Sequence, residues 1–270
     1  MYDIHSHILP AFDDGAVDEK TALHMARIAV EDGITHMACT PHIYPGLYDY
    51  DSEKISQAIT NFSRVIASKK IPLALGIGAD IQMVPDMVTR LNDKTMPTIN
   101  HSRYLLCEPP HHVAPFHFKE SVLDILSAGY IPVITHPERL TWLQDHYDDF
   151  ITVAVHGAWM QLTAGSLTGA FGSTAQYWAE KMLDDGIVHI LATDAHNTGN
   201  RAPELSPGVE RATQHVGKAE ADAMVNERPR AVWDNRPPDS ISQPPGFDKE
   251  GKLHHKPGPG LFRRLLAKLH

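Results

Sequence analysis

Short apolar runs alternate with amphipathic patterns along most of the chain. Apolar residues at helical spacing predict helices at 20–32, 52–68, 118–127 and 175–183. Between them, apolar runs predict about seven strands, at 1–4, 34–40, 72–77, 103–107, 131–135, 159–163 and 188–193. Because strands and helices alternate, we expect an α/β domain with a parallel sheet covered by helices.

Polar side chains stand at or just after the carboxyl end of these predicted strands. They are His5, His7, His42, Asp80, Glu108, His136, Asp194 and His196. In a (β/α) barrel those strand ends converge on the face that carries the active site. An open doubly wound sheet would spread the same residues along a line. We therefore predict a distorted, TIM-like (β/α)7 barrel.

The composition changes near residue 229, and we expect the barrel domain to span residues 1–235. Residues 236–260 are rich in Pro, Gly, Ser and charge, which predicts a mobile linker. Residues 261–270 place their Leu and Phe side chains on one helical face and basic side chains towards the other. Such a helix could contact an anionic membrane surface or a partner groove. A frayed tail is the alternative, because so short a helix is marginal alone.

Charge and cysteine content narrow the class of protein. A formal net charge of −9 argues against a nucleic-acid binder, which normally presents a basic face. Two cysteines, Cys39 and Cys107, favour a reducing compartment over a disulfide framework. No apolar run approaches the roughly 20 residues of a membrane span, and the first residues do not resemble a signal peptide. We expect a cytoplasmic protein.

The residue types at the strand ends suit metal-assisted hydrolysis. Bound metal ions can activate water and stabilise developing charge, and imidazole and carboxylate ligands suit Mn, Fe or Zn. Each candidate also has a structural alternative: a strand-end histidine is often a hydrogen-bonded core residue, and Asp80 could cap a helix. A His-x-His motif alone is weak evidence. The coincidence of so many ligand types on one face favours the metal site, because their burial is costly unless they are paired or metal-bound.

Two other chemistries of phosphate cleavage lack their residues. A cysteine phosphatase needs an arginine six positions after its nucleophile, where this chain has Pro45 and Val113. No Gly-x-x-x-x-Gly-Lys loop occurs either, which argues against a nucleoside triphosphatase. Most histidines away from the strand ends are interpreted as surface or structural. His111 and His112 follow Glu108 closely enough to touch a substrate, but we favour a structural role for them.

Taken together, the motifs resemble those of a known superfamily. They are Asp3-Ile4-His5-Ser6-His7, Asp13-Asp14-Gly15, Thr40-Pro41-His42, Gly78-Ala79-Asp80, Glu108, His136-Pro137-Glu138-Arg139 and Thr193-Asp194-Ala195-His196-Asn197. In this order they are similar to the polymerase-and-histidinol-phosphatase (PHP) superfamily, and more closely to its bacterial protein-tyrosine phosphatases of the CpsB/CapC/YwqE type. The resemblance covers roughly residues 1–230.

The resemblance implies a PHP fold with three metal ions, usually manganese, with iron, zinc or magnesium as alternatives. It implies that His5, His7 and Asp194 hold one ion, that Glu108 and His136 hold a second with Asp80 bridging, and that Asp14, His42 and His196 hold the third. Arg139 and Arg201 match arginines that bind the phosphate. The family usually has Glu where Asp80 stands, and the shorter side chain puts the bridge in doubt.

We expect a metal-dependent protein-tyrosine phosphatase in which a metal-activated hydroxide attacks phosphorus in line. Its partner would be a tyrosine-phosphorylated protein, in particular a bacterial tyrosine kinase that regulates capsule or exopolysaccharide synthesis, with no nucleic-acid partner. Residues 261–270 could hold the enzyme at the inner face of the membrane. The alternatives are a phosphatase for a small phosphomonoester such as histidinol phosphate, a nuclease, which the acidic charge disfavours, and a non-catalytic metal-stabilised scaffold.

Overall fold

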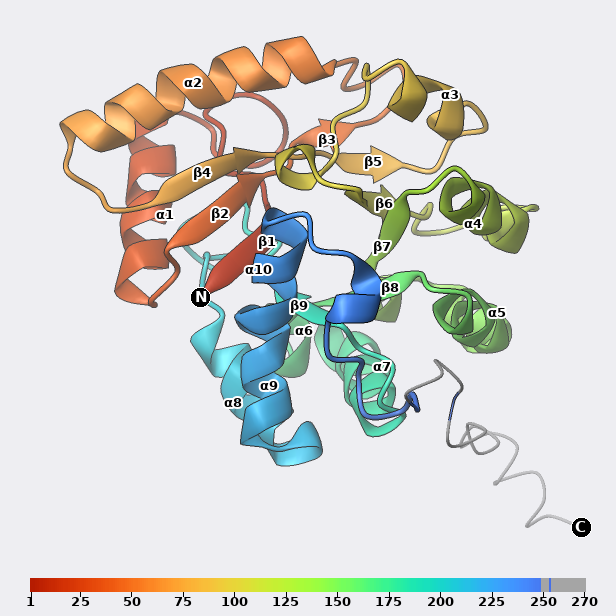
Figure 1. Cartoon of the computed structure of the whole chain (residues 1–270). Helices are drawn as coiled ribbons and strands as arrows, with labels where there is room; N and C mark the ends of the chain where they lie inside the picture. The colour runs from red at the N-terminus through yellow and green to blue at the C-terminus, as the bar shows by residue number, and fades with distance from the viewer. Residues whose placement is uncertain (249–252, 254–270) are drawn as a thin grey trace, which may run out of the picture.

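The structure is a computed structural model that describes residues 1–248 and residue 253 (Figure 1). Its strands are β1 (Tyr2–Ser6), β2 (His36–Cys39), β3 (His42–Ile43), β4 (Ala74–Ile77), β5 (Asp80–Gln82), β6 (Tyr104–Glu108), β7 (Ile131–Thr135), β8 (Trp159–Thr163) and β9 (Ile190–Ala192). Its α-helices are α1 (Glu19–Glu31), α2 (Ser52–Ser68), α3 (Met87–Asn92), α4 (Phe118–Ser127), α5 (Leu143–Val155), α6 (Ala164–Leu167), α7 (Gly172–Asp184), α8 (Ser206–Val216), α9 (Lys218–Val225) and α10 (Glu227–Trp233). Short 3-10 turns are η1 (Ile99–His101), η2 (Pro137–Arg139) and η3 (Pro238–Ser240).

The strands form a ring of hydrogen-bonded parallel neighbours. One sheet has the order β1-β2-β4 and the other the order β3-β5-β6-β7-β8-β9. The ring is completed where β1 meets the chain after β9, through a parallel bridge between Ser6 and Ala195. There the His7 amide donates to the Ala195 carbonyl at 2.9 Å, and the Asp194 amide donates to the His5 carbonyl at 2.9 Å. The predicted distorted α/β barrel is confirmed.

Two of the seven predicted strands resume, after a short break, beyond their predicted ends. Thr40-Pro41 separates β2 from β3, and Gly78-Ala79 separates β4 from β5. The pairing continues beyond both interruptions, because His42 is in register with Asp80 as Cys39 is with Ile77. Each interrupted pair therefore occupies one position in the ring, and seven positions result. The distortion lies where the candidate ligands His42 and Asp80 begin their segments.

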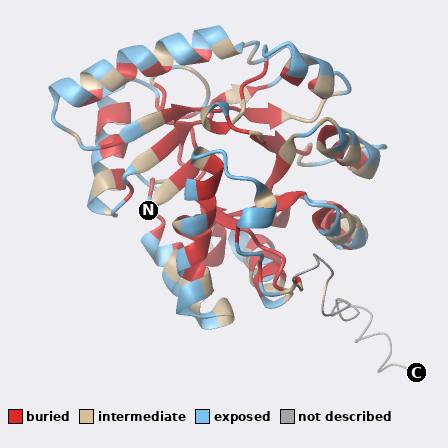
Figure 2. Cartoon of the chain, in the orientation of Figure 1, coloured by how far each residue is buried: buried red, intermediate tan, exposed pale blue. Residues whose placement is uncertain are grey.

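The helices lie outside the ring and turn their apolar faces towards it (Figures 1 and 2). In α2, Ile55, Ile59, Phe62 and Ile66 are buried at spacings of three and four residues. The side chain of Asp51 caps this helix by accepting from the Lys54 amide at 2.9 Å. Asp18 caps α1 in the same way through the Thr21 amide. The outer core between helices and strands is thus built from amphipathic helical stripes.

A second, separate apolar cluster fills the inside of the ring. It contains Ile4, Ala38, Tyr104, Leu106, Val133, Trp159, Ile190 and Ala192 from the strands. Residues two further along several of the same strands are polar: Glu108 after Leu106, Thr135 after Val133, and Asp194 after Ala192. Because alternate residues of a strand share a face, the interior changes from apolar to polar towards the carboxyl ends. The polar layer carries the candidate site.

The opposite end of the ring is closed by α10 and η1. Ala231 and Val232 of α10 and Ile99 of η1 belong to the interior cluster. Gly76 in β4 leaves room for this packing, since a Cβ there would lie 2.4 Å from the Trp233 ring. The amino ends of the strands are therefore plugged by apolar side chains, and the pocket lined by the candidate ligands lies at the other end.

Part of the predicted linker packs on the barrel. Ile241 is buried in the interior cluster, Phe247 is buried in the outer core, and the Gly246 amide donates to the Gly186 carbonyl at 2.9 Å. Part of the segment predicted as a linker, residues 236–248, therefore contacts the barrel domain through these residues. The predicted helix at 261–270 lies outside the described residues. Among the helices that the structure describes, none has the length and apolar character to cross a membrane.

Candidate metal centre

The eight polar residues predicted at the strand ends, together with Asp14, come together at one pocket. Asp14, His42, Glu108, His136, Asp194 and His196 line it, together with Arg139 and Arg201. His5, His7 and Asp80 lie beneath them and are fully or almost fully buried. Every metal ligand predicted from the sequence therefore reaches the same face, at the carboxyl ends of the strands.

Four candidate ligands from three segments meet on one side of the pocket. Ligand atoms of His7, Asp14, His42 and His196 all lie within 4.8 Å of one another. The Oδ1 atom of Asp14 is 3.5 Å from Nε2 of His42 and 3.3 Å from Nε2 of His196. Nε2 of His196 has no hydrogen-bond partner among the described residues although it is buried. Three imidazoles around one carboxylate can hold a transition-metal cation.

Asp80 occupies the centre of the site without a hydrogen-bond donor. Its side chain is fully buried, and neither carboxylate oxygen has a hydrogen-bond partner within the described part of the chain. Oδ2 lies 3.5 Å from both His5 Nε2 and His42 Nδ1, and 3.7 Å from His136 Nε2. Burial acts to raise the pKa of Asp80, but the rings of His5 and His136 outweigh it and hold the pKa well below its usual range. An ionised, buried carboxylate that accepts no hydrogen bond from the described residues is well suited to bind a cation.

A third group of candidate ligands includes a histidine that was not predicted as a ligand from the sequence. Atoms of Glu108, His111 and His136 lie within 4.8 Å of one another, and His111 Nε2 is 3.3 Å from Glu108 Oε1. The sequence analysis favoured a structural role for His111, whereas the structure places it in the lining of the pocket. Its position three residues after Glu108 was the available signal. His112 does not line the pocket.

The backbone turns sharply where two of the ligands leave their strands. His136 follows β7 with a φ of +34°, and Asp194 follows β9 with a φ of +50°. Non-glycine residues rarely adopt this left-handed region. These turns end the extended alternation of the strands and redirect the two side chains, as is common at functional sites.

Residues behind the ligands fix the orientation of the first two histidines. His5 Nδ1 is 2.8 Å from Gln161 Oε1, and His7 Nδ1 is 2.6 Å from Asp13 Oδ2. In both rings the Nε2 atom is thereby left facing the pocket, 3.4 Å from Asp194 Oδ1. Asp13 also accepts a hydrogen bond from the His42 amide at 3.0 Å. Such carboxylate or amide partners commonly orient metal-binding histidines. The sequence analysis quoted Asp13 in a motif but gave it no role.

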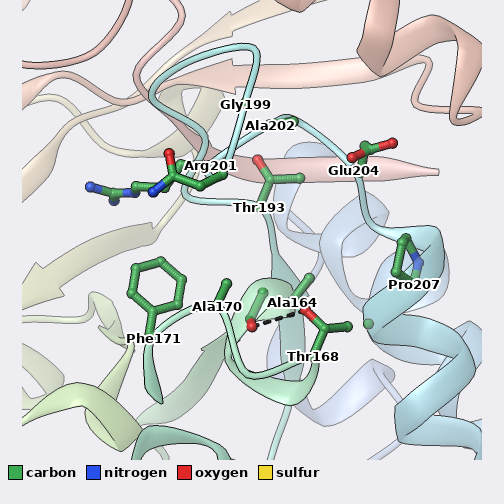
Figure 3. A pocket seen from close by; sticks show the side chains of 13 residues that line it. Ala164, Thr168, Ala170, Phe171, Thr193, Gly199, Arg201, Ala202, Glu204 and Pro207 are labelled. Carbon is green, nitrogen blue, oxygen red and sulfur yellow. Dashed lines mark hydrogen bonds between the residues drawn. The ribbon is translucent and has the colours of Figure 1, made fainter.

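The two predicted phosphate-binding arginines lie side by side at the edge of the cluster. Both donate to Oδ2 of Asp194, Arg201 at 2.6 Å and Arg139 through its Nη1. Their guanidinium carbons lie 4.3 Å and 5.5 Å from the centre of the Phe171 ring. Figure 3 shows Phe171 and Arg201 on the same side of a smaller neighbouring pocket. Asp194 thus faces ligand histidines with one oxygen and arginines with the other.

Burial and the arginines keep at least one ring neutral. Burial, followed by the positive charge of Arg139, lowers the pKa of His136 to about 4. A neutral imidazole is the form that binds a metal ion. Burial also lowers the pKa of His196, with the nearby His7 acting in the same direction. The nitrogen and carboxylate donors, the unpaired buried oxygens and the neutral rings together fit metal ions of the manganese, iron or zinc type.

Comparison with known proteins gives one consistent result. The family model described as "Capsular polysaccharide synthesis, CpsB/CapC" matches residues 1–234. The tyrosine-protein phosphatase YwqE of Bacillus subtilis is 33% identical over 253 residues, which cover 94% of this chain and 98% of that protein. The putative tyrosine-protein phosphatase CapC of Staphylococcus aureus is 33% identical over 201 residues, or 74% of this chain and 79% of that protein.

A solved structure shares the whole fold. It is described as belonging to crystal structures of YwqE from Bacillus subtilis and CpsB from Streptococcus pneumoniae, "unique metal-dependent tyrosine phosphatases". The superposition has a TM-score of 0.85 with 30% sequence identity, and it covers 91% of this chain and 98% of that chain.

Proposed function

The chain belongs to the CpsB/CapC family of capsular polysaccharide synthesis, and we propose that it is a metal-dependent protein-tyrosine phosphatase. Relatives that bear this activity in their names match nearly the full length of the chain. The alternative of a small-molecule phosphatase has no such support. The observation that carries the proposal is the fully buried Asp80, which has no hydrogen-bond partner in the described part of the chain and is surrounded by ligand-type side chains beside two arginines.

The proposed metal ligands are His5, His7, Asp14, His42, Asp80, Glu108, His136, Asp194 and His196. We propose three ions, with manganese as the metal used in the cell. When bound, such ions lower the pKa of water and neutralise the charge of a phosphoryl group. The local groupings suggest one refinement of the predicted sets: His7 lies with Asp14, His42 and His196, and His111 lies with Glu108 and His136.

The remaining side chains position the phosphate. Arg139 and Arg201 present planar guanidinium groups that can bind phosphate oxygens in pairs of hydrogen bonds. Stacking on Phe171 holds both guanidinium groups at the edge of the metal cluster. A phenolate leaving group has a pKa near 10, so it needs less protonation than an alkoxide. This favours phosphotyrosine in a site to which we assign no general acid.

The physiological substrate is proposed to be a tyrosine-phosphorylated protein, in particular a tyrosine kinase that controls capsule or exopolysaccharide synthesis. The family description supports this link to capsule synthesis. Peripheral contact with the membrane through residues 261–270 would bring the enzyme close to a membrane kinase. Deletion of residues 249–270 should then lower co-sedimentation with anionic liposomes, and unchanged partitioning would refute the membrane contact.

Substitutions in the site test the function directly. His42→Ala, Asp194→Ala and Arg139→Ala should each nearly abolish turnover of p-nitrophenyl phosphate. Matched controls are His24→Ala, an exposed histidine of α1, and Arg211→Ala, which removes a surface ion pair with Glu180. Both controls should keep wild-type turnover. Full activity in a site variant would remove that residue from the mechanism.

Metal analysis and a substrate panel test the metal and the substrate class. The purified protein should bind manganese and hydrolyse phosphotyrosine peptides in its presence, and treatment with a chelator should abolish both. Histidinol phosphate at equal enzyme concentration should be a poor substrate. Faster turnover of histidinol phosphate would favour the small-molecule alternative, and metal uptake without any turnover would favour a non-catalytic scaffold.

A further inference from the structure

Three large side chains of a short hairpin line the metal pocket although they are not ligand types. Tyr44, Leu47 and Tyr48 share this pocket with His42, Arg139 and the other candidate ligands. Leu47 is 67% exposed and Tyr44 is 40% exposed, so neither contributes fully to the core. We propose that Tyr44, Leu47 and Tyr48, here called the hairpin wall, bind the phenyl ring of the substrate and select phosphotyrosine over phosphoserine.

The hairpin wall has a defined position relative to the metal ligands. The Tyr44 amide donates to the Tyr48 carbonyl at 3.1 Å, and the Tyr48 amide donates back to the Tyr44 carbonyl at 2.8 Å. Gly46 takes a left-handed φ of +79° at the turn, and its amide donates to the Asp49 carboxylate. The turn follows directly on β3, which supplies His42. The wall and a candidate ligand are thus held on one short, hydrogen-bonded segment.

Aromatic stacking anchors the wall on both sides. The Tyr48 ring lies 5.9 Å from the His42 ring, with an angle of 18° between the planes. On its other side it stacks near Tyr50, with ring centres 6.5 Å apart. Tyr50 in turn packs on Phe12, and its hydroxyl donates to the Phe12 carbonyl at 2.6 Å. This row of rings connects Tyr48 of the wall to Phe12.

The two kinds of lining match the two parts of a phosphorylated phenol. The arginines, and the metal ions that the carboxylate–histidine clusters would hold, suit the phosphate, whereas the exposed apolar and aromatic surfaces suit a ring. Phosphoserine carries its phosphate on a single methylene group and offers no ring for this surface. The inference rests on the proposed function, because it names what distinguishes the substrates of the same site.

Single and double substitutions in the wall test the proposal. In Tyr44→Ala/Leu47→Ala, kcat/KM for a phosphotyrosine peptide should fall about three- to tenfold, mainly through KM, because ring contacts are lost. The inhibition constant of inorganic phosphate, which has no ring, should not change. Tyr44→Phe and Leu47→Met keep the apolar surface and should retain wild-type KM. Tyr177→Ala removes an equally exposed tyrosine of α7 and is the matched control.

The outcomes separate this proposal from the proposed function. An unchanged KM in the double variant would overturn the proposed role of the hairpin wall. An equal loss of affinity for inorganic phosphate would also overturn it, because the hairpin would then be acting on the metal cluster. Wild-type protein without phosphotyrosine hydrolysis would refute the proposed function. The wall would then be judged from binding alone, by comparing phenyl phosphate with inorganic phosphate in calorimetry. Should the double variant fold poorly, Leu47→Ser changes only an exposed side chain and replaces it.

Discussion

The two ends of the barrel bury charge in opposite ways. At the amino-terminal end, Arg228 of α10 is fully buried and every group of its guanidinium is used. It forms two hydrogen bonds with Glu220, at 2.6 Å and 3.0 Å, and donates to the carbonyls of Ser242 and His189. At the carboxyl-terminal end, Asp80 is equally buried and has no hydrogen-bond partner among the described residues.

This difference separates a structural charge from a functional one. A buried ion pair with complete hydrogen bonding repays much of its desolvation cost, and it is sensitive to the loss of either partner. Asp80 has only imidazole rings at 3.5–3.7 Å to compensate its charge, and a bound cation would compensate it more fully. The amino-terminal end should therefore determine stability without metal, and the carboxyl-terminal end should determine activity.

The strongest test of this contrast is Asp80→Asn, which removes the charge and keeps the shape. We expect turnover to fall about a thousandfold or more, because several kcal/mol of transition-state stabilisation come from the bound ions. The metal content should fall in parallel. The free energy of unfolding of the metal-free protein should fall only modestly, because the neighbouring histidine rings lose a negative partner but no hydrogen bond to Asp80 is broken among the described residues. Phosphatase assays with manganese and urea denaturation in chelator measure the two effects.

A loss of about 3 kcal/mol in the metal-free Asp80→Asn protein, the size expected when a buried ion pair is broken, would contradict the comparison. It would mean that the histidine rings stabilise Asp80 as strongly as Arg228 stabilises Glu220. Wild-type activity in the variant would remove Asp80 from the proposed ligand set.

The converse substitution is Glu220→Ala, which leaves Arg228 buried without its carboxylate. We expect a loss of about 3 kcal/mol in the free energy of unfolding, as is usual when one member of a buried pair is removed. The kcat of the folded variant should equal that of the wild type, because neither residue lies near the pocket lining. Urea denaturation and steady-state kinetics at a temperature below the transition check both expectations.

Glu180→Ala is the matched control for this variant. Glu180 pairs with Arg211 at 2.8 Å, but both side chains are partly exposed. Exposed pairs contribute about 0–1 kcal/mol, so the control should unfold almost as the wild type does. Equal destabilisation in the two variants would show that burial of Arg228 does not set the cost.

The residues of the candidate site were predictable to the extent that they sit at the ends of apolar strands. His5, His136 and Asp194 follow runs whose burial is encoded locally, and parallel strands bring their carboxyl ends together whatever the details of packing. For the same reason the barrel class followed from alternating periodicities. The location of these residues needed no knowledge of distant contacts.

Features that depend on contacts between distant segments were not predictable in this way. His111 lies in a loop without periodicity, so its closeness to Glu108 in the sequence did not by itself decide between a pocket position and a structural role. The short strands β3 and β5 begin after Pro41 and Gly78-Ala79, beyond the predicted apolar runs, and the hairpin wall at 44–48 has no regular pattern. Residues 236–248 have the composition of a linker, yet Ile241 finds a place in the interior cluster. Composition reports the average cost of ordering a segment and not a specific apolar anchor.

Asp80→Glu sharpens the comparison with a smaller effect, because the resemblance identified Glu as the usual residue at this position. The longer side chain keeps the charge and adds one methylene group in a fully buried place. We expect kcat to change by no more than about tenfold and the metal content to be retained, because the ligand type is the same. Titration with manganese and phosphatase kinetics measure the effect. Loss of metal binding would show that this barrel positions its backbone specifically for Asp.

The smallest expected effect concerns His36 at the amino-terminal end, where the ring stacks on Tyr2 at 4.2 Å and meets the edge of Trp233 at 5.3 Å. Burial lowers the pKa of His36 below its ordinary value, so the folded state favours the neutral ring. Its contribution to stability is therefore complete above the unfolded pKa of about 6.5 and is lost as the pH falls towards the folded pKa. His36→Phe keeps an aromatic ring but removes both the titration and the 2.9 Å contact of His36 Nδ1 with the Thr35 hydroxyl. The difference in free energy of unfolding between wild type and variant should therefore be constant above about pH 6.5 and should change below it. The metal-site histidines titrate in both proteins, so their contributions cancel in this difference. If the plots of unfolding free energy against pH stay parallel below about pH 6.5, the His36 ring packs equally well when it is charged. The amino-terminal end would then tolerate a charge without a partner.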